Sequence, residues 1–110
     1  GVIGEATLDF INKFRGDFGI IGISGVDPQD GSLLDYDYQE VRVAQSIINN
    51  SRTVFLAADN AKFGRNAMVR LGSISQVDTL FTDVKPPEAI QNILLEHDVS
   101  LTLCQPETSK

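Results

Sequence analysis

The sequence predicts an α/β fold built on a largely parallel sheet with covering helices. Short apolar segments alternate along the chain with segments whose apolar residues recur at helical spacing. Such alternation favours parallel strands joined by crossover helices. The apolar segments are rich in Ile, Val and Leu and carry no charge, as is typical of strands inside a parallel sheet. The 110 residues suit one compact domain, and no repeat or linker divides them.

Two helices and two strands are predicted in the first half of the chain. The helices are recognised by one apolar face and the strands by short uncharged runs. The first strand is expected to be buried on both faces, and the polar, turn-rich segment after it is expected to be a loop. In chain order the expected elements are helix Glu5–Phe14, strand Phe18–Ser24, loop Gly25–Gly31, helix Tyr38–Asn50 and strand Thr53–Ala58.

The second half of the chain predicts two more strands and a third helix. Two prolines open this helix, since proline is tolerated in a first helical turn. One segment, Asn66–Leu71, fits a strand and a helix equally well. The other expected elements are loop Asp59–Gly64, strand Thr79–Thr82, helix Pro86–His97, strand Val99–Cys104 and a disordered tail at Gln105–Lys110.

Composition excludes several classes of function. The net charge of −6 comes from fifteen acidic and nine basic residues, so the chain lacks the cationic excess with which proteins grip DNA phosphates. The lone Cys104 forms no internal disulfide, and no run reaches the roughly 18 residues of a membrane span. We therefore expect a cytoplasmic protein with no membrane contact. Neither a cofactor motif nor the spacing of a metal site is present.

Four residues are candidates for a binding site. In open α/β sheets, ligands collect beyond the carboxyl ends of the strands, where Gly25, Asp27 and Lys62 are expected. Gly25 can expose backbone N–H groups, and Lys62 supplies a cation for a phosphate. Asp27 and Glu40 can accept hydrogen bonds from hydroxyl groups, and in an enzyme such a carboxylate could move protons.

Each candidate also has a purely structural interpretation. Gly25 can serve only to shape a turn, and Lys62 can be a solvated surface lysine. Glu40 can simply favour the positive end of its helix. The residue types alone leave these alternatives open.

Several segments together resemble the C-terminal sensor domain of the DeoR-type repressors. The resemblance extends over about Ile3–Cys104, and it is carried by the segments Ile3–Phe10, Phe18–Gly25, Gly31–Leu34, Glu40–Arg42 and Lys62–Val69. It implies a partial three-layer, Rossmann-like fold similar to ribose-5-phosphate isomerases and CoA-transferases. It also implies a domain that binds a phosphorylated sugar or polyol, with glycerol 3-phosphate as the first choice, and thereby releases operator DNA.

The resemblance also implies roles for the candidate residues. In the related isomerases, an acidic loop, a catalytic glutamate and an Asp-x-x-Lys lysine line the phosphate site. Ser24–Asp27, Glu40 and Asp59–Lys62 resemble these three features. The isomerases have a further lysine between the loop and the glutamate, but Gly31–Gln39 contains none. We therefore expect an effector site of Gly25, Asp27, Glu40 and Lys62 with no catalysis, the alternative being an isomerase fragment with Glu40 as its base.

Full-length members of the resembling family are longer than this sequence. They carry an N-terminal winged helix-turn-helix and the first strands of the sensor, and nothing here corresponds to either. We therefore expect residues 1–104 to be the C-terminal part of a sensing domain. Contact with operator DNA would depend on the missing segment, and a homo-oligomer is expected because such repressors usually act as oligomers.

Overall fold

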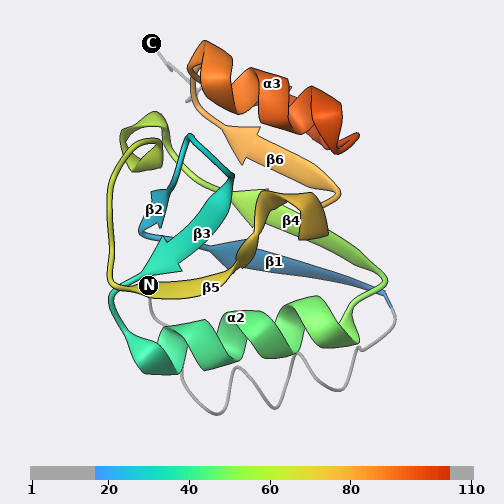
Figure 1. Cartoon of the computed structure of the whole chain (residues 1–110). Coiled ribbons are helices and arrows are strands. Elements are labelled where there is room, and N and C mark those ends of the chain that lie inside the picture. The colour runs from blue at the N-terminus through green and yellow to red at the C-terminus, as the bar shows by residue number, and fades with distance from the viewer. Residues whose placement is uncertain (1–16, 105–110) are drawn as a thin grey trace, which may run out of the picture.

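The computed structural model describes residues 17–104, which form two sheets, two helices and two short 3-10 turns (Figure 1). The expected helix Glu5–Phe14 and the expected tail Gln105–Lys110 lie outside the described residues. The α/β class and the predominance of parallel pairing are confirmed. No helix within residues 17–104 has the length and apolar character that crossing a membrane requires.

Four parallel strands form the larger sheet, in the order β1-β4-β6-β7. The order advances in one direction, as right-handed crossovers with short connections produce. All four predicted strands are confirmed to within two residues at either end. Their bounds are β1 Phe18–Gly22, β4 Thr53–Ala57, β6 Thr79–Thr82 and β7 Ser100–Leu103.

Two of the predicted helices are present among the described residues. Helix α2 spans Tyr38–Asn50 as predicted, and the carboxylate of Asp37 caps it by accepting the Gln39 N–H at 2.9 Å. Helix α3 spans Glu88–Glu96 and buries Ile90, Ile93 and Leu94. Each helix therefore turns an apolar stripe inward, which is the pattern that identified it in the sequence.

A second sheet of three antiparallel strands was not predicted. It consists of β2 Gly25–Val26, β3 Ser32–Asp35 and β5 Val69–Ser73, in that order. The prediction of a loop throughout Gly25–Gly31 is therefore wrong at its first two residues, which pair with Leu33 and Leu34. The strand has only two residues, which is too short for an alternating pattern, so the turn residues around it conceal it. The ambiguous segment Asn66–Leu71 enters β5 at Val69, and the 3-10 turns are η1 Asn60–Lys62 and η2 Ile74–Gln76.

The core lies on one face of the parallel sheet. Ile21, Leu56 and Leu80 point to this face and are almost fully buried, together with Ile47 of α2 and Ile90 of α3. The expectation that β1 is buried on both faces is wrong, because its residues alternate between exposed and buried. Within residues 17–104, packing covers one face of this strand only.

The opposite face of the parallel sheet carries a row of aromatic side chains. Phe18 is 58% exposed and Ile20 is 56% exposed. Phe55 links the row, because its ring centroid lies 5.8 Å from that of Phe18 and 5.3 Å from that of Phe81. These separations are in the range of favourable aromatic pairs.

Candidate functional site

The carboxyl ends of the parallel strands meet at one edge of the sheet. Gly22 at the end of β1 pairs in register with Ala57 at the end of β4, and Ala57 pairs with Phe81 near the end of β6. The segments that follow these strands therefore emerge side by side. Ligands bind at this edge in open α/β sheets.

Gly25 is buried in β2, where its lack of a side chain is required. A Cβ atom at this position would collide with the backbone carbonyl oxygen of Arg65. The structural interpretation of Gly25 is thus supported, since a close approach of two backbone segments depends on it. The same contact places Gly25 against the segment that follows Lys62.

Asp27 shapes the turn between β2 and β3. Its Oδ1 accepts the N–H of Gln29 at 2.9 Å, and its own N–H donates to the carbonyl oxygen of Ser32 at 2.9 Å. Its carbonyl oxygen accepts the N–H of Gly31 at 2.8 Å, where φ is 76°. The half-buried carboxylate has one oxygen committed to the turn by these contacts.

The segment after β4 runs directly beside β2. Val26 forms an isolated parallel bridge with Phe63, and its carbonyl oxygen accepts the N–H of Gly64 at 2.9 Å. Asp27 follows Val26 and Lys62 precedes Phe63 along the chain. The structure therefore brings together the two segments that the sequence analysis expected at this edge.

Lys62 lies at the end of η1 and is held by the residue that caps this turn. Its Nζ is 3.3 Å from Oδ2 of Asp59, whose Oδ1 accepts the N–H of Ala61 at 2.9 Å. The Ala61 N–H, followed by the Lys62 ammonium and the charge of Arg65, lowers the pKa of the exposed Asp59 carboxyl. Lys62 is thus a partly buried cation paired with a carboxylate that stays ionised at neutral pH.

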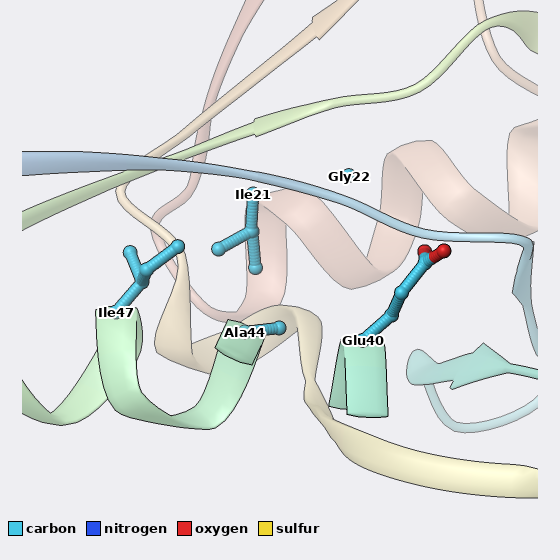
Figure 2. A pocket seen from close by; sticks show the side chains of 5 residues that line it. All are labelled: Ile21, Gly22, Glu40, Ala44 and Ile47. Carbon is cyan, nitrogen blue, oxygen red and sulfur yellow. The ribbon is translucent and has the colours of Figure 1, made fainter. Parts of the chain in front are cut away.

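Glu40 lies in the first turn of α2, and its side chain approaches the same edge of the sheet near the end of β1. Figure 2 shows its side chain extending from the helix toward β1 beside Gly22. Glu40 lines a small recess with Ile21, Gly22, Ala44 and Ile47. The recess has a volume of about 10 Å³, close to the least that one water molecule needs. It is therefore too small to hold an effector.

The four candidates are brought together only in part. Backbone contacts join the segment of Gly25 and Asp27 to that of Lys62, and Glu40 lies at the end of β1 on the same edge. Among residues 17–104, Lys62 pairs with Asp59, and no hydrogen bond or ion pair joins it to Glu40. Within the same range, no three His, Cys, Asp or Glu side chains are arranged to hold a metal ion.

Sequence reasoning missed several polar side chains at this edge. Asp83 follows β6 and accepts the N–H of Asn60 through its Oδ1 at 2.8 Å. The hydroxyl of Tyr36 donates to the carbonyl oxygen of Asn66 at 2.9 Å. Asp83 follows a predicted strand directly, so the rule that identified Lys62 would also have identified Asp83.

A larger hollow of about 400 Å³ lies elsewhere, between α2 and β5. It is lined mainly by polar side chains, including Gln45, Asn49, Arg70 and Gln76. Its cation, Arg70, already donates from Nε to the hydroxyl of Ser32 at 3.0 Å. Its volume falls within the range of small-molecule sites. The hollow is therefore the alternative location for a ligand, instead of the edge where the carboxyl ends of the parallel strands meet.

Residues 1–84 match the family model described as the DeoR C terminal sensor domain. The chain is 60% identical to the glycerol-3-phosphate regulon repressor of Escherichia coli strain K12, over 94% of this chain and 41% of that protein. It is 58% identical to the protein of the same name from Haemophilus influenzae, over 94% of this chain and 40% of the relative. The transcriptional repressor CsqR of Escherichia coli is 31% identical, over 96% and 40% respectively. The chain thus spans about two fifths of the length of these transcription regulators.

Proposed function

The chain belongs to the DeoR C-terminal sensor domain family, and from this premise we propose that it is the effector-sensing part of a DNA-binding transcriptional repressor. The proposed effector is a phosphorylated polyol or sugar, with glycerol 3-phosphate as the first candidate. The names of the most similar relatives given above support this choice. The regulated genes would then be those of glycerol metabolism.

Lys62 is the proposed partner of the effector phosphate. A hydrogen bond to a charged group contributes about 1.5 to 3 kcal/mol, and an ammonium suits the charge of a phosphate. Gly25 would bring backbone groups close to the ligand, while Asp27 and Glu40 would accept hydrogen bonds from its hydroxyls. The effector would have to displace or share the Asp59 carboxylate that now holds Lys62.

The observation that most supports this proposal is the bridge between Val26 and Phe63. It brings the turn of Asp27 beside that of Lys62 at the carboxyl edge of the sheet, where α/β proteins bind ligands. Three of the four proposed residues thereby come from two adjoining segments. Glu40 extends toward the same strand ends from α2 (Figure 2).

Effector binding would act on DNA through a segment outside these 110 residues. The net charge of −6 disfavours direct contact of this chain with the phosphates of the DNA backbone. Binding would shift the intact repressor toward a state that holds operator DNA weakly, by as much as effector affinity differs between the two states. We further propose that the repressor is a homo-oligomer and works in the cytoplasm, where a bacterial operator lies.

The direct test is operator release by the intact repressor that contains this domain. We predict that Lys62→Ala raises the glycerol 3-phosphate concentration needed for half release by about 10- to 100-fold, because one charged contact is lost. Gel-shift titration or fluorescence anisotropy of labelled operator measures the midpoint. Arg52→Ala is the matched control, since this exposed cation lies between α2 and β4, at the amino end of the strand.

Two outcomes would contradict the assignment of the site. An unchanged midpoint for Lys62→Ala would remove this residue from the effector site. A shift for Arg70→Ala without one for Lys62→Ala would move the site to the hollow beside β5. We also propose that the domain is not an enzyme, and turnover of ribose 5-phosphate that Glu40→Gln abolishes would instead support the isomerase alternative.

A further inference from the structure

Asp83 joins the end of β6 to the turn that carries Lys62. Its Oδ1 accepts three donors: the Asn60 N–H at 2.8 Å, the Val84 N–H at 2.9 Å and the Thr82 hydroxyl at 3.3 Å. Thr82 is itself buried, so the carboxyl group is anchored in the sheet. Through Asn60 it reaches the neighbouring segment that follows β4.

The short turn η1 is fixed by two carboxyl groups, one from the segment after β4 and one from the segment after β6. The carboxylate of Asp83 accepts a hydrogen bond from the N–H of Asn60, and that of Asp59 accepts one from the N–H of Ala61 at 2.9 Å. The N–H of Lys62 donates to the carbonyl oxygen of Asp59 at 3.1 Å. Every backbone donor of η1 therefore has an acceptor, which leaves the turn with one well-defined position.

We propose that Asp83 is a positioning residue, which places Lys62 for the effector by holding the first N–H of its turn. This inference rests on the proposed role of Lys62 in binding the phosphate. Without Asp83, the start of η1 would depend on the Asp59 cap, which lies within the same segment, while Phe63 and Gly64 would keep their contacts with Val26. The ammonium would then extend from a turn whose first N–H is no longer held by the residue after β6.

Charge argues that Asp83 acts on Lys62 and not on the ligand. A further carboxylate beside the phosphate would repel it, so direct contact of Asp83 with a phosphate would be unfavourable. The oxygen that carries the contacts of Asp83 is already occupied by three donors. Its contribution to effector affinity would therefore come from the geometry of η1.

The test is a set of effector titrations on the intact repressor with glycerol 3-phosphate as the probe. We expect Asp83→Ala to weaken binding about three- to tenfold, the size of one or two lost hydrogen bonds. Asp83→Asn keeps an acceptor oxygen for Asn60 and should stay within about twofold of the wild type. In a Lys62→Ala background, Asp83→Ala should have no further effect on affinity, because its role depends on that ammonium.

Asp78→Ala provides a matched structural control. Like Asp83, Asp78 uses a carboxyl oxygen to accept a backbone N–H from a neighbouring segment, here that of Val54 in β4 at 2.7 Å. This contact lies at the amino ends of the strands, away from Lys62. Its loss should lower the unfolding midpoint in urea while leaving effector affinity unchanged. Loss of affinity in both variants in proportion to stability would overturn the proposal, because Asp83 would then act only on the fold.

The outcomes separate this inference from the proposed function. If Lys62→Ala binds normally, the site itself is wrong, whatever Asp83 does. If Lys62→Ala binds weakly while Asp83→Ala binds normally, the site stands and the positioning role is overturned. Should Asp83→Ala fail to fold, hydrogen exchange of the Asn60 amide in the wild type and in Asp83→Asn still tests whether the bond from Asn60 to Asp83 forms. Protection in both supports the bond, and fast exchange in the wild type refutes it.

Discussion

Lys62 is held by a neighbouring acidic side chain. Its ammonium pairs with Asp59 at 3.3 Å, and the same carboxyl group caps the turn that leads to the lysine. An exposed ion pair of this kind contributes little stability. If Lys62 binds the effector phosphate as proposed, the incoming anion would compete with this carboxylate.

The lowered pKa of Asp59 gives a prediction for this single residue. The Ala61 N–H is the largest cause and the Lys62 ammonium follows it. We predict that the carboxyl group of Asp59 titrates below its ordinary value of 3.8. In Lys62→Ala the pKa should rise yet remain below that value, because the bond from Ala61 persists. Carboxyl-carbon NMR titration of both proteins measures it.

The sign of this effect fixes the pH range in which it acts. A carboxyl group with a lowered pKa favours the folded turn above its ordinary pKa, and this contribution is lost as the pH falls through the folded value. At neutral pH, Asp59 is therefore ionised and paired with Lys62. A pKa of Asp59 at or above 3.8 in the wild type would contradict the contacts that are described here.

Among the secondary-structure elements, β2 determines how the site is assembled. It has only two residues, Gly25 and Val26, yet it contacts β3 on one side and the segment around Phe63 on the other. The sequence indicated a polar, turn-rich loop here, with no sign of a strand. A two-residue strand has no periodicity of its own, and one of its partners, Phe63, is distant in sequence.

Substitution of Gly25 tests the close approach at β2. We predict that Gly25→Ala lowers the free energy of unfolding by about 1 to 3 kcal/mol, the usual cost of forcing an extra methyl group into packed structure. The reason is the collision with the carbonyl oxygen of Arg65. Urea unfolding followed by circular dichroism measures the change.

Gly22→Ala is the control for this substitution. An added Cβ at Gly22 meets nothing within 4 Å, and a strand residue gains slightly from the replacement of glycine. Its stability should therefore equal or slightly exceed that of the wild type. Equal effects of the two substitutions would show that the approach of β2 to Arg65 does not limit packing at Gly25.

On the scale of the whole molecule, sequence reasoning succeeded where structure is local. Helix α2 and the four parallel strands were predicted because the apolar pattern of each lies within its own segment. The antiparallel sheet was missed, since β3 and β5 pair across more than thirty residues, as Leu34 with Arg70 shows. Burial of β1 on both faces was wrong, because periodicity identifies a strand but not what covers it.

The meeting of two of the candidate segments could be predicted for the same physical reason. Parallel strands end at a common edge, so residues after β1 and β4 were expected to meet, and the bridge between Val26 and Phe63 joins them. The strand rule could have placed Asp83 at this edge, but its proposed positioning role depends on a hydrogen bond to Asn60 that no sequence pattern indicates. The role of these residues in effector binding stays a prediction.

Amide NMR of the chain would map where glycerol 3-phosphate binds, and so whether Lys62 lies in the effector site. We predict shifts of the amides of Gly25–Asp27 and Asn60–Arg65 on addition of glycerol 3-phosphate, and no such shifts with glycerol, which lacks the phosphate. The amide of Asp78, at the opposite edge, should stay unchanged in both titrations. Shifts centred on Arg70 and Gln45, with none around Lys62, would contradict the account.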